Sequence, residues 1–170
     1  MVRIDHVLDT WKKIREDSIA AVEEFPAAEF DFSPAPGVAT FREIARHILD
    51  AGDGLTGLLL SGDPNLSGPD FRERLQPHKR PLPENFGPAE LAAALRESIE
   101  QRTGQLAAQT PEFFSEIVTR VDGLKVTRLE LVQFVKEHEL THRSQLFMCM
   151  RLKGLVPSTT RKRLARQAAR

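Results

Sequence analysis

Four long segments of the chain carry apolar residues three and four positions apart, and this spacing most constrains the fold. In the first segment the repeat includes Val7, Trp11 and Ile14. Such spacing places the apolar side chains on one face of an α-helix, where they can pack against other helices. The four segments span residues 2–24, 41–60, 88–108 and 128–153.

Capping residues mark where three of these helices begin. Thr40 with Glu43, and Thr127 with Glu130, have the Thr-x-x-Glu spacing of a capping box. Pro88 suits the first position of a helix, where its missing N–H costs nothing. Four long helices with little strand predict an all-α fold, specifically a four-helix bundle.

Two stretches between the helices interrupt this pattern. Residues 62–87 contain five prolines and predict a long loop between the second and third helices, with a single helical turn from Pro69 through Leu75. Residues 114–127 contain two β-type runs around Asp122-Gly123, a hairpin turn signal. We therefore expect a short β-hairpin just before the last helix.

The length of 170 residues predicts one domain with a single core. We assign residues 1–157 to the bundle domain and residues 158–170 to a basic C-terminal tail. From Arg151 onward the chain has seven Lys or Arg and no acidic residue. Such a tail is typically a solvated, frayed terminus, and nucleic-acid contact is its minor interpretation, so no nucleic-acid partner is expected.

The cellular compartment follows from cysteine content and apolar runs. Cys149 is the only cysteine, which excludes an internal disulfide and fits a reducing compartment. The acidic N-terminal residues lack the apolar region of a signal peptide, and no apolar run has the 18 or so residues that a membrane span needs. We expect a cytoplasmic protein without a membrane partner.

The sequence HELTH, residues 138–142, matches the H-E-x-x-H motif of zinc proteases. A protease of that type needs a third metal ligand downstream, either Glu or His. The 28 residues after His142 include no His, Asp or Glu. The zinc-protease interpretation is therefore rejected.

A different metal site remains, with its third ligand upstream. His138 and His142 lie on the apolar stripe of the last helix, four residues apart, so one ion could bridge them. His47 lies on the apolar stripe of the second helix. Three imidazoles facing the same interior would make an open metal site with a position left for water. The alternative is a set of hydrogen-bonded core histidines without metal.

Several neighbouring residues have weaker claims to a role. Glu139 is expected to face solvent, and a role as general base would depend on the rejected protease geometry. Asp50 is a candidate fourth ligand, or an acceptor of a hydrogen bond from a ligand histidine, and Gln145 is a candidate hydrogen-bond partner of a ligand histidine. His78 is expected to be a solvated loop residue, and Cys149 a small core residue.

The run EFDFSPAPGVATFREIARHILDAG and the run VKEHELTHRSQLFMCMRLKGLVP together resemble the DinB-like (DinB/YfiT) family of metal-dependent proteins. The resemblance extends from the first helix to Pro157. The positions that carry it are Pro36-Gly37, His47, His138, His142, Arg143, Gln145 and the segment 152–157. Ser144 stands where glycine is common in the family.

The resemblance implies a four-helix bundle that binds a divalent ion, often nickel or zinc, on His47, His138 and His142. It also implies a homodimer and, in some relatives, metal activation of a low-molecular-weight thiol, as in thiol S-transferases and a mycothiol-dependent isomerase. Our leading hypothesis is a metal-dependent thiol transferase, in which a thiolate attacks an electrophilic small-molecule substrate held under the 62–87 loop. The alternatives are a hydrolase that uses metal-bound hydroxide, and a non-enzymatic metal-binding or stress-response module.

Overall fold

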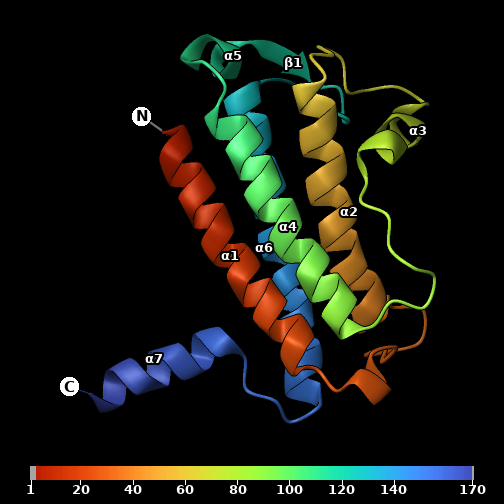
Figure 1. Ribbon diagram of the computed structural model, residues 1–170, viewed down its shortest axis with the longest axis vertical. Coiled ribbons are helices and arrows are strands. Elements are labelled where there is room, and N and C mark those ends of the chain that lie inside the picture. The colour runs from red at the N-terminus through yellow and green to blue at the C-terminus, as the bar shows by residue number, and fades with distance from the viewer. Residues whose placement is uncertain (1–2, 170) are drawn as a thin grey trace.

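The computed structural model describes residues 3–169. Most of them form helices, and two short strands complete the secondary structure (Figure 1). The helices are α1 (Ile4–Glu24), α2 (Phe41–Leu60), α3 (Phe71–Leu75), α4 (Pro88–Ala107), α5 (Pro111–Ser115), α6 (Arg128–Leu152) and α7 (Ser158–Ala168). The short 3-10 helices are η1 (Ala27–Glu29) and η2 (Gln76–His78), and the strands are β1 (Ile117–Thr119) and β2 (Lys125–Thr127).

The four long helices form the predicted four-helix bundle. Helix α1 packs against α4 and α6, and α2 packs against the same two helices, which closes the bundle into a ring. Figure 1 shows the four helices running side by side, with α3 outside α2 and the α5–β1 segment across one end. The expected start of the first helix at residue 2 lies outside the described residues, and α1 begins at Ile4.

The predicted helix starts are confirmed in atomic detail. The Thr40 hydroxyl accepts a hydrogen bond from the Glu43 N–H at 3.2 Å, and the Glu43 carboxylate accepts one from the Thr40 N–H at 2.7 Å. Thr127 and Glu130 repeat this arrangement at the start of α6. Each box satisfies backbone donors that the first helical turn leaves free.

The segments between the long helices contain the predicted elements and one further helix. The predicted helical turn is α3, and the predicted hairpin pairs Val118 with Val126 in antiparallel register. Helix α5 was not predicted, although Thr110 caps it and Pro111 occupies its first turn. A segment of five residues is too short to show apolar periodicity, so these two residues were its whole signal.

A polar layer divides the core into two apolar clusters. One cluster includes Leu49 and Leu146, and the other includes Leu55 and Val135. Between them the buried polar residues of the four long helices meet across the bundle axis. These residues are Arg15 on α1, Asp53 on α2, Ser98 on α4 and Glu139 on α6.

The basic tail is folded, which corrects the expectation of a frayed terminus. Residues 158–168 form α7, which extends away from the bundle in Figure 1. The Ser158 hydroxyl donates to Asp17 at 2.9 Å, and the Lys162 ammonium lies 3.0 Å from the same carboxylate. An acidic group on α1 therefore anchors the start of this basic helix. Within residues 3–169, no helix is long and apolar enough to cross a bilayer.

Candidate metal centre

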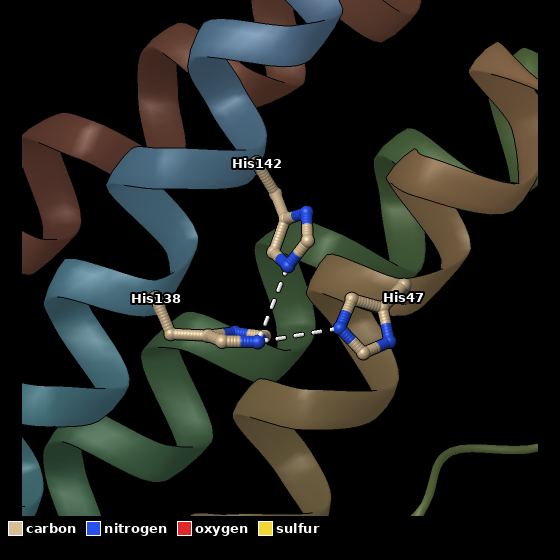
Figure 2. A group of neighbouring side chains, drawn as sticks. All are labelled: His47, His138 and His142. Atoms are coloured by element: carbon tan, nitrogen blue, oxygen red, sulfur yellow. Dashed lines mark hydrogen bonds between the residues drawn. The ribbon is translucent and has the colours of Figure 1, made fainter. Parts of the chain in front are cut away.

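Helices α2 and α6 bring together the three histidines singled out in the sequence. The Nε2 atom of His138 lies 3.3 Å from Nε2 of His47 and 3.2 Å from Nε2 of His142. Figure 2 shows the three rings converging from the two helices. One nitrogen of each ring lies within 4.8 Å of the others, and within residues 3–169 no carboxylate or thiol joins this group.

The spacing of these nitrogens suits a divalent ion. A tetrahedral zinc ion with Zn–N bonds of about 2.0–2.1 Å needs ligand nitrogens about 3.3–3.4 Å apart. Two of the three separations are close to this value, and the nitrogens of the remaining pair, His47 and His142, lie within 4.8 Å of each other. Imidazole nitrogens are also preferred ligands of zinc and nickel. The residues present therefore fit a metal with three protein ligands and further positions open to small molecules.

The site lies at the edge of the bundle, which corrects the expectation that the imidazoles face its interior. His47 is exposed, and His138 and His142 are half-buried. The α6 stripe that carries His138 and His142 is only partly buried, because Leu131, Val135 and Cys149 lie in the core whereas Gln145 and Leu152 are exposed. Glu139 also lies on the interior face of α6.

The expectation that Glu139 faces solvent was wrong. Its side chain is 3% exposed and lies in the polar layer of the core. It accepts hydrogen bonds from the Arg15 guanidinium at 2.7 and 2.8 Å, from the Trp11 indole at 2.6 Å and from the Ser18 hydroxyl at 3.1 Å. A carboxylate with four such donors is fully engaged, and it faces away from the histidines that flank it in the sequence.

Gln145 lies within hydrogen-bonding distance of His142. Its Oε1 atom is 2.7 Å from Nδ1 of His142. A carbonyl oxygen can only accept, so Nδ1 of His142 carries the proton and Nε2 presents its lone pair to the centre of the triad. Metal-binding histidines commonly use such a second hydrogen bond to fix their tautomer.

Asp50 lies close to the triad but is already paired. Its carboxylate accepts a hydrogen bond from Arg46 at 2.8 Å, one turn earlier on α2, and lies 3.9 Å from the Lys79 ammonium. It is not in the group of converging ligand atoms. Asp50 nevertheless acts on His47 electrostatically, since its negative charge opposes the fall in the His47 pKa.

The surroundings keep two of the three imidazoles neutral. Burial, and then the nearby His142 and His47, together lower the pKa of His138 to about 4. Burial also lowers the pKa of His47, with His142 as the next cause. A neutral imidazole is the form that binds a metal, so neither ring has to release a proton at neutral pH.

Two cavities adjoin the triad, one on each side of His47. The first, about 310 Å³, borders His47 and His142 and continues along Ile44, Met148 and Cys149. The second, about 240 Å³, borders His47 and His138 and continues beneath α3. A molecule in either cavity would therefore lie against ligand nitrogens.

The remaining candidates have structural roles. Cys149 is buried as predicted, and burial raises the pKa of its thiol, which disfavours the reactive thiolate. His78 is not the solvated loop residue that was expected. It is half-buried and packs on α2 so closely that a Cβ atom at Gly57 would lie 2.5 Å from its own Cβ.

The family is shown by a match of residues 10–146 to the sequence model of the DinB superfamily. The chain belongs to this superfamily. A DinB-like protein of Bacillus subtilis has a similar structure, with a TM-score of 0.68 and 20% identity over 88% of this chain and 92% of the other. No curated protein sequence matches the chain.

Two further solved structures share the fold of this DinB-superfamily protein. YfiT from Bacillus subtilis, described as a probable metal-dependent hydrolase with an unusual four-helix bundle topology, has a TM-score of 0.61 and 18% identity over 87% of each chain. A mycothiol-dependent maleylpyruvate isomerase has a TM-score of 0.63 and 15% identity over 85% of this chain and 61% of its own. At such identities these likenesses show the fold alone.

Proposed function

We propose that this DinB-superfamily protein is a metal-dependent enzyme of the thiol S-transferase type. The observation that carries the proposal is the convergence of three imidazole nitrogens at an exposed edge of the bundle, with no fourth ligand among residues 3–169 in the group. Closed structural sites surround zinc with four protein ligands, whereas reactive sites leave a position for a small molecule.

In this proposal, different residues of the chain bind the metal and orient its ligands. His47, His138 and His142 would hold a zinc or nickel ion, and Gln145 would keep His142 in the correct tautomer. When bound, such an ion lowers the pKa of a coordinated thiol, so that a thiolate is available near neutral pH. The two cavities beside His47 would receive the thiol and the electrophilic substrate separately.

The second candidate is a hydrolase that uses the same three ligands with water as the nucleophile. It is supported by the similar structure of YfiT, a protein described as a probable metal-dependent hydrolase. The thiol-dependent alternative is supported by the similar structure of the mycothiol-dependent isomerase. We favour the transferase because two cavities adjoin the triad, and a hydrolase needs only one organic substrate beside its water.

Metal analysis tests the ligand set first. The purified protein should contain about one zinc or nickel ion per chain after incubation with either metal and removal of the excess. His47→Ala should abolish stoichiometric binding, because it removes the ligand on α2. His6→Ala is the matched control, since His6 is an exposed histidine near the start of α1. Normal metal content in the His47 variant would overturn the proposal.

A reaction screen then separates the two enzymes. The metal-loaded protein is mixed with a low-molecular-weight thiol and an aryl halide, or with an ester reporter and no thiol. Metal-dependent formation of a thioether supports the transferase. Ester cleavage without any thiol-dependent product would favour the hydrolase instead.

A further inference from the structure

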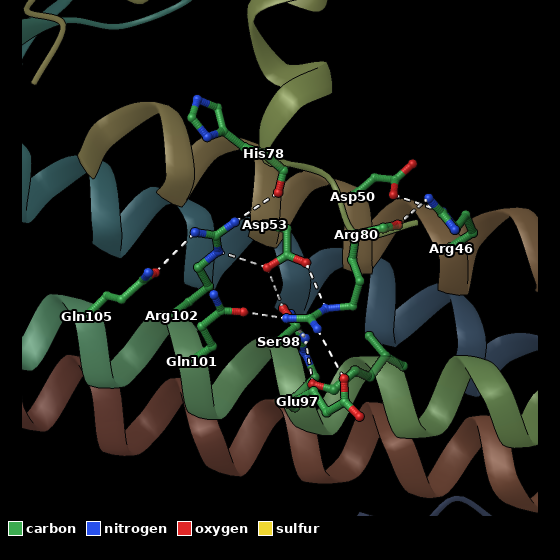
Figure 3. A network of polar contacts seen from close by, with 12 residues as sticks. Arg46, Asp50, Asp53, His78, Arg80, Glu97, Ser98, Gln101, Arg102 and Gln105 are labelled. Carbon is green, nitrogen blue, oxygen red and sulfur yellow. Dashed lines mark hydrogen bonds and ion pairs between the residues drawn. The ribbon is translucent and has the colours of Figure 1, made fainter. Parts of the chain in front are cut away.

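Residues 76–82, here called the strap, are fixed to the bundle through their backbone. The Arg102 guanidinium on α4 donates to the carbonyl oxygen of His78 at 2.8 Å. The Arg46 guanidinium on α2 donates to the carbonyl oxygen of Arg80 at 3.0 Å. Figure 3 shows both contacts. The residue between these two carbonyls, Lys79, is therefore held in place on both sides.

The side chain of Arg80 adds a third attachment. It lies 3.1 Å from the Glu97 carboxylate, donates to Gln101 at 2.6 Å and approaches the buried Asp53 carboxylate at 3.4 Å (Figure 3). These acceptors lie on α4 and α2, so the strap bridges two helices of the bundle. Such multiple anchoring makes the strap a fixed wall and not a mobile cover.

Two glycines of α2 allow this close approach. A Cβ atom at Gly57 would lie 2.5 Å from the His78 side chain, and one at Gly54 would lie 3.3 Å from Leu75. Glycine inside a helix is unfavourable by about 0.5–1 kcal/mol relative to alanine. Here it lets α3 and the strap lie directly on the helix that carries His47.

The strap, through Lys79, and α3, through Phe71 and Leu75, border the smaller of the two cavities beside the triad. Its apolar lining includes Leu55, Phe71, Leu75 and Phe134. Its polar lining consists of the two ligand histidines together with Asp50 and Lys79. Ligand cavities combine a mostly apolar lining with a few polar groups that select the ligand, and drug-sized ligands occupy about 300–1,000 Å³. A volume of about 240 Å³ therefore suits a compact molecule.

Among the cations around this cavity, Lys79 forms a long ion pair with Asp50 but makes no hydrogen bond within the described part of the chain. Arg46 is paired with Asp50 at 2.8 Å, and Arg102 is paired with Asp53 at 2.9 Å. The Lys79 ammonium lies 3.9 Å from Asp50, beyond hydrogen-bonding distance. Within residues 3–169 it has no hydrogen-bond acceptor, although an ammonium group carries three donors. A ligand with a negative group could use these donors without breaking an existing hydrogen bond.

We propose that Lys79 is a specificity-determining residue that selects a small organic carboxylate, with its apolar body against Phe71 and Phe134. This inference rests on the proposed function, since it assigns a substrate class to the same metal site. The strap favours anion binding because it holds the backbone of Lys79 in place before the ligand arrives. Because Lys79 is held between two anchored carbonyls, little backbone freedom is lost when its ammonium binds an anion.

The test uses metal-free protein, because a carboxylate could otherwise bind the metal itself. The probes are phenylacetate and its uncharged analogue phenylacetamide, which have similar shapes. Their dissociation constants are measured by chemical-shift titration. We expect the wild-type protein to bind phenylacetate about fivefold more tightly than the amide, the ratio expected of one partly exposed ion pair.

Substitutions of Lys79 then test whether its charge causes the preference for phenylacetate over the amide. Lys79→Met should bring the ratio to about one while leaving the affinity for the amide unchanged, and Lys79→Arg should keep the preference. Lys125→Met, on the exposed hairpin, removes the same charge and should change neither probe. No binding of phenylacetate, equal affinity of the wild type for both probes, or a full preference in Lys79→Met would overturn the assignment.

This outcome is independent of metal binding. If the histidines hold no metal, the proposed function fails, but the anion preference of the metal-free protein still decides the role of Lys79. If the metal is bound and the preference is absent, the proposed function stands and the assignment of Lys79 falls.

Discussion

Arg15 and Glu139 form a two-point ion pair in the middle of the bundle. Nε of Arg15 lies 2.7 Å from Oε1 of Glu139, and Nη2 lies 2.8 Å from Oε2. The side chains are 0% and 3% exposed. This pair joins α1 to the helix that carries two of the three histidines, and it sets which face of α6 points inward. The glutamate of the H-E-x-x-H motif therefore positions the helix.

Removing the negative charge of this pair should destabilise the protein. Glu139→Gln leaves the Arg15 guanidinium buried without its counter-charge, which typically costs about 3–5 kcal/mol. We expect a loss of this size in the free energy of unfolding, measured with urea at pH 7. Glu137→Gln, on the exposed side of the same helix, should change it by no more than about 0.5 kcal/mol. A stable but inactive Glu139→Gln variant would point instead to a general base.

Gln145 should strengthen metal binding without touching the metal. Gln145→Leu removes the acceptor for Nδ1 of His142, and losses of such partners typically lower metal affinity about 10-fold to 100-fold. Competition with a chromophoric chelator measures this affinity. Gln133→Leu serves as the control, because Gln133 lies on the same helix and bonds to Glu137 and Lys136. Unchanged affinity in Gln145→Leu would show that His142 needs no partner.

Two glycine substitutions should have opposite effects on stability. Gly57→Ala places a Cβ atom 2.5 Å from that of His78, and such overpacking typically costs about 1–3 kcal/mol. Gly104→Ala in α4 meets no atom within 4 Å, and alanine favours a helix by about 0.5–1 kcal/mol. Thermal unfolding of both variants checks the two signs. Stabilisation by both would mean that the strap does not lie on α2.

The metal-free protein should lose stability as the pH falls from 6.5 towards 4. Burial, and then the neighbouring histidines, hold the pKa of folded His138 at about 4, below the ordinary value of 6.5. Between these values the unfolded chain binds a proton that the folded chain does not, so stability is present above pH 6.5 and decreases below it.

Unfolding free energies of metal-free wild type and His138→Gln, compared from pH 7.5 to 4.5, isolate this contribution. The wild type should show the steeper decrease, because the variant has no imidazole to protonate at this position. A histidine titration followed by NMR that gives His138 its ordinary pKa would contradict the prediction.

Local patterns in the sequence determined the four long helices and the hairpin. The capping boxes at Thr40 and Thr127 depend on residues three positions apart, and the turn at Asp122-Gly123 depends on two neighbours. Such short-range interactions are complete within one segment, so they can be predicted without the rest of the fold. The apolar repeats likewise predicted four helices that need partners, and hence the bundle.

The tertiary structure decided how each helix is turned and what its polar residues contact. On α6, apolar periodicity predicted that the stripe with His138 and His142 faces the core and that Glu139 faces solvent. The structure buries Glu139, because Trp11, Arg15 and Ser18 on α1 supply donors for both carboxylate oxygens.

The histidines consequently lie at the edge of the bundle, beside cavities that sequence periodicity does not reveal. The sequence by itself determined the four long helices, their capped starts and the three histidines that share a pair of helix faces. Only the tertiary structure decided that Glu139 is a core anchor, that residues 158–168 form a helix anchored at its start and that the strap holds Lys79 beside the triad. The physical reason is that a polar side chain can be buried only where distant segments supply its partners.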